Sequence, residues 1–133
     1  MKPPQLKRKL LLAGYLAVLG LIIWCADHAE TRFAFDWVRT LPGGDKLGHF
    51  LILGGLALTL NHALNGRSFR MLGHPVLLGS ALALAFAASE ECTQLWILGR
   101  TFDLADLAAD ALGIWLLGQL ARLTPCVPGP EEP

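Results

Sequence analysis

Apolar residues along the 133-residue chain gather in four long blocks that are separated by short polar segments. A helix needs roughly 20 predominantly apolar residues to cross the hydrocarbon core of a bilayer, and each block is close to that length. None of the blocks alternates between apolar and polar residues as a half-buried strand does. The pattern therefore predicts an all-α fold, an integral membrane four-helix bundle, with helices at about 10–26, 47–64, 75–98 and 104–121.

Glycine and proline mark the ends of these predicted helices. A turn rich in proline and glycine precedes the second block, Asn65-Gly66 follows it, and Gly99 closes the third. Pro75 suits the first turn of the third helix, where a missing backbone N–H costs nothing. We expect residues 1–124 to form one transmembrane domain and residues 125–133 to form a disordered tail.

The first apolar block follows a basic segment, which is also the arrangement found in signal peptides. Its length of about 17 residues is long for the apolar part of such a peptide. Trp24 also interrupts the small residues that a lipoprotein signal would place before Cys25. We interpret this block as a retained helix.

Composition supports a membrane protein and excludes other classes. Apolar residues make up 53% of the chain and charged residues 17%, with eleven Lys and Arg balanced by eleven Asp and Glu. The mean hydropathy is +0.47. A chain this apolar is not disordered, and its zero net charge gives no indication of a nucleic-acid partner.

The charges are sorted between the two predicted sides of the membrane. Seven basic residues lie on the side of the termini: Lys2, Lys7, Arg8, Lys9, Arg67, Arg70 and Arg122. Four lie on the other side: Arg32, Arg39, Lys46 and Arg100. The positive-inside rule then places both the N-terminus and the C-terminus in the cytoplasm, and all acidic residues except Glu131 and Glu132 fall on the outer side or within the spans.

Polar residues within the spans concentrate at the outer ends of the last three predicted helices. Each ionisable one costs of order 2.5–3.5 kcal/mol on insertion scales, so we expect it to have a partner or a function. Glu91 continues a stripe of small residues at every fourth position, which would turn it into the bundle. The sequence predicts an outward-facing polar pocket formed by Asp45, Lys46, His49, Glu91, Gln94, Arg100, Asp103, Asp106 and Asp110.

Two interpretations of this pocket rest on its carboxylates. His49, Glu91 and Asp106 offer an imidazole and two carboxylates, which form a ligand set for a divalent cation. Glu91 and Asp110 could instead share a proton, since two buried carboxylates rarely both ionise. No cofactor other than such a cation is indicated.

Two further interpretations concern its cations and its helices. Lys46 and Arg100 at the rim could receive the phosphate or carboxylate of a lipid or glycolipid headgroup. Alternatively, the polar residues form a purely structural network of salt bridges and hydrogen bonds that locks the helices together.

The remaining polar and sulfur-containing residues have simpler interpretations. Asn61 is expected at the membrane interface, at the cytoplasmic end of the second helix. The three cysteines, Cys25, Cys92 and Cys126, do not make a disulfide framework and are interpreted as free thiols. A single bridge between Cys25 and Cys92 stays an alternative, because both are predicted near the outer ends of their helices.

Three motifs follow one another over the last three predicted helices: Asp45-Lys46-x-x-His49-Phe50, Glu91-x-x-Gln94 and Arg100-x-x-Asp103-x-x-Asp106-x-x-x-Asp110-x-x-Gly113. Their order and gaps resemble those of the VanZ-like family of small bacterial membrane proteins. The founding member of that family is associated with low-level resistance to the glycopeptide teicoplanin. Many members carry Asn where this chain has Asp110, which favours proton sharing with Glu91 in this chain.

The resemblance implies a multi-pass protein of the bacterial cytoplasmic (inner) membrane. We expect its pocket to engage an envelope lipid or glycolipid headgroup and to influence sensitivity to teicoplanin-type antibiotics. The alternative is a membrane enzyme that acts on a lipid-linked substrate through His49, Glu91 and Asp106. The chain has no P-loop, nucleophile elbow or His-Glu-x-x-His pair to identify a known reaction. The expected partners are membrane lipids, and a homo-oligomer is an open alternative.

Overall fold

The computed structural model describes residues 3–124 of the chain, and the segment predicted as a disordered tail lies outside these residues. This part is mostly helical, as predicted, with four long helices: α1 (Pro3–Asp27), α3 (Gly44–Ala63), α4 (Leu78–Thr93) and α5 (Leu104–Gln119). A short helix, α2 (Asp36–Arg39), follows a 3₁₀ turn (Arg32–Phe35), and further 3₁₀ turns follow α4 (Gln94–Trp96) and α5 (Leu120–Leu123).

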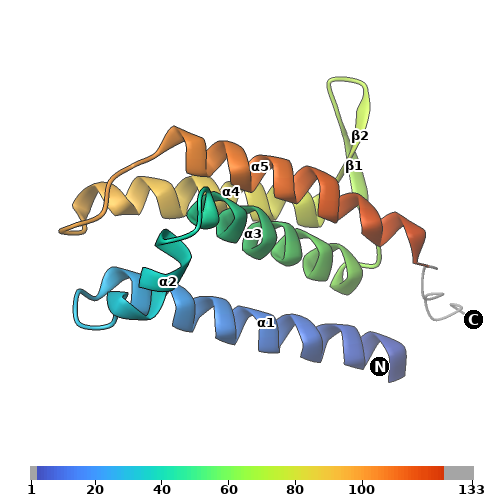
Figure 1. Ribbon diagram of the computed structural model, residues 1–133. Helices are drawn as coiled ribbons and strands as arrows, with labels where there is room; N and C mark the ends of the chain where they lie inside the picture. The colour runs from blue at the N-terminus through green and yellow to red at the C-terminus, as the bar shows by residue number, and fades with distance from the viewer. Residues whose placement is uncertain (1–2, 125–133) are drawn as a thin grey trace, which may run out of the picture.

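The four long helices run side by side (Figure 1), with α3, α4 and α5 packed together and α1 lying along α3. Their common core is made of small and branched residues: Leu19 from α1, Leu53, Leu56 and Ala57 from α3, Ala83 and Ala87 from α4, and Ile114 from α5. The start of α1 and the end of α5 lie at the same end of the molecule (Figure 1).

Glycines allow α3 and α5 to approach each other closely. A Cβ atom placed on Gly54 would lie 2.7 Å from the backbone oxygen of Gly113, and one on Gly113 would overlap the backbone oxygen of Phe50. Small residues at a helix interface permit this backbone-to-backbone contact. The close contact brings the first turns of α3 and α5 together, where the predicted polar residues lie.

The outer surface of α1 is apolar. Large side chains such as Leu10, Leu11, Leu21 and Trp24 are more than half exposed along it. Two helical segments, Pro4–Asp27 and Leu104–Leu123, are long and apolar enough to cross a membrane by length and composition. The four spans and the cytoplasmic location of both termini stay predictions.

The prediction for residues 75–98 was wrong at both ends. An antiparallel hairpin of β1 (Ser68–Met71) and β2 (His74–Leu77) precedes α4, and Pro75 pairs with Arg70 in it instead of starting the helix. The two turn residues, Leu72 and Gly73, have φ angles of 50° and 82°. Positive φ at both positions is the geometry of a tight two-residue hairpin turn. The alternation of polar and apolar residues in Ser68–Met71 was the sequence pattern that could have indicated a strand here.

The other end of the same block also leaves the helix early. α4 ends at Thr93, and Ile97 is extended with φ −103° and ψ 122°. Leu95, Trp96 and Leu98 are strongly exposed. Their apolar character continues the pattern of the helix, so periodicity alone could not locate its end. Gly99, with φ +79°, closes the segment as predicted.

Two further predictions can be compared with the structure. Cys25 and Cys92 are both free thiols, which agrees with the favoured interpretation. Asn61, predicted at the cytoplasmic end of its helix and at the membrane interface, lies in the last turn of α3 and is fully buried between helices; its depth in the membrane stays a prediction. Its amide nitrogen donates to Ser80 Oγ (2.9 Å) and to the Gly118 carbonyl (3.3 Å), and its amide oxygen accepts the Ser80 N–H (3.2 Å). Asn61 therefore joins α3 to α4 and α5.

We expect Asn61→Ala to lower the free energy of unfolding by about 1 kcal/mol. It breaks hydrogen bonds between helices, and in membrane proteins each such bond contributes about 0.6 kcal/mol on average. Thermal unfolding of the detergent-solubilised protein measures the loss. Thr59→Val is the matched control, since the buried Thr59 hydroxyl bonds only to the Gly55 and Leu56 carbonyls of its own helix. Equal losses in the two variants would contradict a linking role for Asn61.

Candidate functional site

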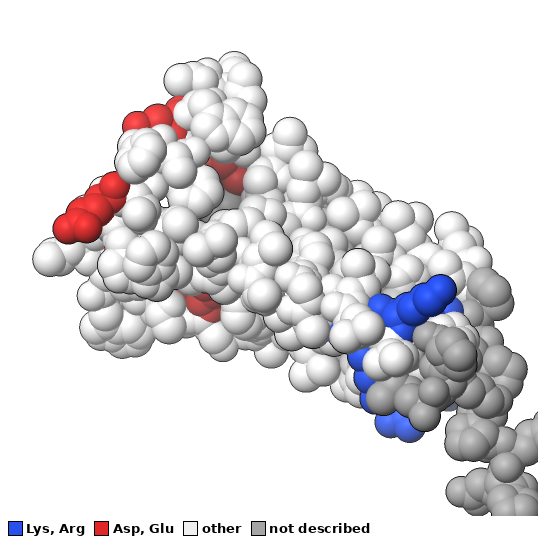
Figure 2. Space-filling view, turned by 90° about the horizontal axis from the view of Figure 1, so that it is seen from below, with Lys and Arg blue, Asp and Glu red and all other residues white. Residues whose placement is uncertain are grey.

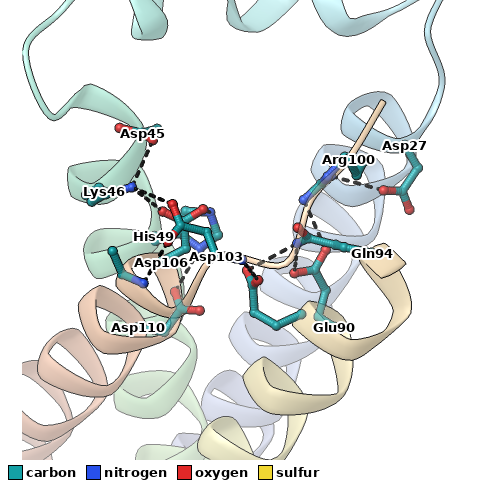
Figure 3. Close-up of polar contacts among 12 residues, drawn as sticks. Asp27, Asp45, Lys46, His49, Glu90, Gln94, Arg100, Asp103, Asp106 and Asp110 are labelled. Carbon is teal, nitrogen blue, oxygen red and sulfur yellow. Dashed lines mark hydrogen bonds and ion pairs between the residues drawn. The ribbon is translucent and has the colours of Figure 1, made fainter. Parts of the chain in front are cut away.

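The ammonium group of Lys46, in the first turn of α3, lies among three carboxylates (Figure 3). Its Nζ is 2.7 Å from Asp106 Oδ1 and 3.2 Å from both Asp45 Oδ2 and Asp103 Oδ2. The side chain of Asp106 is 16% exposed, whereas that of Lys46 is 39% exposed. Lys46 thus ties the start of α3 to the start of α5 and is already neutralised by protein groups.

Asp103 is placed by its role as the N-cap of α5. Its backbone is extended, and its Oδ1 accepts the N–H of Ala105 at 2.8 Å, which satisfies one of the free donors of the first turn. The hydrogen bond from the Ala105 N–H, followed by that from Lys46, lowers the pKa of the Asp103 carboxyl below its ordinary value. Asp103 is therefore an anion at neutral pH.

His49 lies one turn after Lys46 and faces two carboxylates of α5. Its Nδ1 is 3.0 Å from Asp110 Oδ1, and its Nε2 is 3.6 Å from Asp106 Oδ2. The spacing of four residues between Asp106 and Asp110 places both on one face of α5, as predicted. Asp110 is 1% exposed, so this pair lies at the inner end of the site.

Glu91 is the most deeply buried carboxylate of the site, with no exposed surface. Its Oε2 accepts the backbone N–H of Asp103 at 3.2 Å, and its Oε1 accepts a hydrogen bond from Gln94 Nε2 at 3.2 Å. The same nitrogen of Gln94 donates to Glu90 at 2.7 Å. Among residues 3–124, no Lys, Arg or His lies within ion-pair distance of Glu91, so hydrogen bonds alone hold it.

Arg100 connects the segment after α4 to the end of α1. Its Nη1 is 3.0 Å from Asp27 Oδ1, and its Nη2 is 3.4 Å from Glu90 Oε1. All three side chains are largely covered, with exposed fractions between 16% and 23%. The nine predicted residues therefore fall into two adjoining groups (Figure 3), one around Lys46 and His49 and one around Arg100 and Gln94. Glu91 joins the second group through its hydrogen bond from Gln94.

A cavity of about 690 Å³ lies beside these groups. Six of the nine predicted residues line it: Asp45, His49, Gln94, Arg100, Asp106 and Asp110. Lys46, Glu91 and Asp103 do not line the cavity. They bind residues that do or one another: Lys46 pairs with Asp106 and Asp103, and Glu91 bonds to Gln94 and to the Asp103 N–H. The rest of the wall is largely apolar and includes Leu19, Ile22 and Ile23 of α1, Leu51 and Ile52 of α3, and Phe86 of α4. The cavity is thus polar at one end and apolar along its side.

The VanZ/LLP1 family model matches residues 13–124, which include every predicted site residue. The chain belongs to this family. No curated protein and no solved structure gives a significant match. Family membership and the two apolar helical segments together indicate that this VanZ-like chain is a membrane protein.

Two arginines of the VanZ-like site were not among the predicted residues. Arg32, at the start of the 3₁₀ turn before α2, and Arg39, the last residue of α2, both line the cavity. Arg32 donates to the backbone oxygens of Ala26, Asp27 and Leu98 at 2.7–3.1 Å, and no carboxylate neutralises it among the described residues. Arg39 is exposed and has neither a hydrogen bond nor an ion pair to any residue in 3–124. Both lie in a loop between two predicted helices, and helical spacing gives no information on which residues a loop side chain contacts.

Carboxylates outnumber cations in the VanZ-like site. The two groups contain seven carboxylates, of which Glu91 alone makes no ion pair within residues 3–124, against Lys46 and Arg100. The seven come from Asp27, Asp45, Glu90, Glu91, Asp103, Asp106 and Asp110. Counting Arg32 and Arg39 as well still leaves three more negative than positive charges when His49 is neutral. Figure 2 shows the wider pattern on one face, with acidic side chains toward one end and basic ones toward the other.

Proposed function

We propose that this VanZ-like protein binds the phosphate-bearing headgroup of an envelope lipid or glycolipid in the cavity of about 690 Å³. By doing so it influences the sensitivity of the cell to glycopeptide antibiotics of the teicoplanin type. The observation that carries the proposal is the amphipathic lining of the cavity, which has charged groups at one end and a continuous apolar side. A membrane lipid has the same division between headgroup and acyl chain.

The apolar side of the cavity accounts for the acyl part of such a ligand. Leu19, Ile22 and Ile23 come from α1 and face the cavity together with Leu51 from α3. Burial of hydrocarbon contributes about 25 cal/mol per Å². A small soluble metabolite would gain little binding free energy from an apolar wall, whereas the acyl chain of a lipid buries hydrocarbon against it.

The arginines account for the headgroup. A guanidinium group binds phosphate oxygens through two parallel hydrogen bonds. Arg39 is the cation best placed for this role, because it lines the cavity and no described carboxylate neutralises it. Arg32 also lines the cavity, but its side chain already donates to the backbone oxygens of Ala26, Asp27 and Leu98. Arg100 lines the same cavity but is shared with Asp27 and Glu90, and Lys46 is surrounded by three carboxylates. The contact first expected for Lys46 is therefore reassigned to Arg39.

The proposed setting is the bacterial inner membrane, crossed several times, with both termini in the cytoplasm. The excess of basic residues on the side of the termini supports this orientation. The cavity then opens toward the outer leaflet, where precursors and targets of surface-acting antibiotics are exposed.

Native mass spectrometry of the purified protein tests the proposal. We expect the wild type to retain a phosphate-bearing lipid, and Arg39→Ala to lower its retention about tenfold because one charge-assisted contact is lost. Arg70→Ala is the matched control, since Arg70 is an exposed arginine of the hairpin and does not line the cavity. The mass of the retained molecule distinguishes a phospholipid from a glycolipid.

The same variants separate the proposal from a purely structural network. Arg39→Ala should reach wild-type abundance in the membrane while losing the effect of the protein on teicoplanin sensitivity. Equal lipid retention by wild type, Arg39→Ala and Arg70→Ala would argue against headgroup binding. A purely structural network instead predicts that Arg39→Ala leaves teicoplanin sensitivity unchanged. It also predicts that Arg100→Ala changes this sensitivity by lowering the abundance of the protein in the membrane.

A further inference from the structure

Three side chains from three different helices converge at the inner end of the site. His49 of α3, Glu91 of α4 and Asp110 of α5 each offer one ligand atom, and these atoms all lie within 4.8 Å of one another. Glu91 and Asp110 are 0% and 1% exposed. An imidazole nitrogen and two carboxylate oxygens are ligands that Zn²⁺ and Mn²⁺ accept.

The trio holds two carboxylates and at most one positive charge, that of a protonated His49. Glu91 has no cationic partner among the described residues. Asp110 Oδ1 faces His49, but the other oxygen, Oδ2, accepts no hydrogen bond from any residue in 3–124, although Asp110 lines the cavity. Burying a carboxylate without a counter-charge is costly. A cation bound between these residues removes that cost.

The distance between two of the ligand atoms fits a shared cation. In an octahedral site, neighbouring ligand atoms about 2.1 Å from the metal are about 3.0 Å apart, and His49 Nδ1 is 3.0 Å from Asp110 Oδ1. Glu91 lies within 4.8 Å of both but beyond ion-pair distance of His49, so its side chain must move inward to reach the same cation. The second nitrogen of His49 is directed at Asp106, 3.6 Å away. A carboxylate on the outer nitrogen orients the ring of a metal-binding histidine. The sequence predicted Asp106 as the third ligand. In the structure Asp106 fits the orienting role, and Asp110 is the third ligand instead.

We propose that His49, Glu91 and Asp110 bind one divalent transition-metal cation, and that this cation binds the phosphate of the proposed headgroup. The second part of this inference rests on the proposed function. A site in which carboxylates outnumber cations repels an anion, so arginines at the cavity wall alone leave the inner end unfavourable for phosphate. Three protein ligands leave the remaining coordination positions of the cation open toward the cavity.

Titration with Mn²⁺ tests the cation site directly. After treatment with a chelating resin, the purified wild-type protein should bind one Mn²⁺ per chain, measured as the loss of the free Mn²⁺ signal in electron paramagnetic resonance. Glu91→Gln and Asp110→Asn keep the side-chain size and should each weaken binding at least tenfold. Asp45→Asn is the matched control, because Asp45 lines the same cavity outside the trio and should bind Mn²⁺ as the wild type does.

Two outcomes would overturn the cation site. These are the absence of stoichiometric Mn²⁺ binding in the folded wild type, and losses in Asp45→Asn as large as those in Asp110→Asn. A shared proton between Glu91 and Asp110 would produce the first of these. Circular dichroism confirms that each variant is folded before its affinity is compared.

Lipid retention with and without EDTA separates this inference from the proposed function. We expect EDTA to release the retained lipid from the wild type and Mn²⁺ to restore it. Lipid that is lost in Arg39→Ala but insensitive to EDTA would overturn the metal–phosphate contact and leave headgroup binding intact. Stoichiometric Mn²⁺ binding without any retained lipid would support the cation site and contradict the proposed function.

Discussion

Gly113→Ala is expected to lower the free energy of unfolding by about 3 kcal/mol, because it adds a methyl group where two helix backbones touch. The new Cβ would overlap the Phe50 carbonyl, and backbone atoms of a helix cannot rotate away as a flexible side chain can. Helix α5 must then move away from α3. The same movement separates His49 from Asp110, so binding at the site should weaken together with stability.

Thermal unfolding of the purified protein in detergent measures this effect. Gly20→Ala in α1 is the control, since a Cβ there meets nothing within 4 Å and the substitution adds the same methyl group to a helix. We expect Gly20→Ala to unfold at the wild-type temperature or above it. If Gly113→Ala is as stable as Gly20→Ala, α3 and α5 do not make the close contact described above.

Lys46→Ala is expected to lower the free energy of unfolding by about 2 kcal/mol at neutral pH. Removing one partner of a buried ion pair costs roughly 3–5 kcal/mol, and the partial exposure of Lys46 reduces this through solvent screening. Without the ammonium group, Asp45, Asp103 and Asp106 repel one another. Lys46→Arg keeps the positive charge and should retain most of the stability.

The loss in Lys46→Ala should depend on pH in a defined direction. The pKa of Asp103 is lowered in the folded wild type, so its stabilising contribution is present above the unfolded pKa and disappears as pH falls through the folded pKa. In Lys46→Ala, protonation of the carboxylates instead relieves their repulsion. Unfolding measured from pH 7 down to about pH 2 should therefore show the two proteins converging below about pH 4. A difference that stays constant with pH would show that charge is not its cause.

The identities of the site residues were largely accessible from the sequence. Ionisable residues are expensive in apolar helices, so Glu91 and Asp110 stand out without any structure. The four-residue repeat of small residues that ends at Glu91 predicted its burial, and Glu91 has no exposed surface. Asp106 and Asp110 share a face of α5 because their spacing is close to one helical turn.

The partners of those residues were not accessible in the same way. Spacing along one helix gives the face on which a residue lies but not the atom that it meets on another helix. The sequence placed Asp106 beside His49 and Glu91 as a possible cation ligand, whereas the structure brings Asp110 within 4.8 Å of both. Arg39 looked like an ordinary loop arginine until the turn through α2 brought it to the cavity wall.

The apolar blocks and the three motifs were enough to identify a mostly helical VanZ-like membrane protein and the residues that carry its unusual buried charge. Helical periodicity and the cost of charge in apolar segments act locally, so they can be read along the chain. Four features came only from the folded structure: the hairpin before α4, the burial of Asn61, the apolar wall that α1 adds to the cavity, and the meeting of His49, Glu91 and Asp110. These features depend on how closely separate helices approach and on where turns redirect the chain, which are distances in space that one-dimensional spacing does not contain.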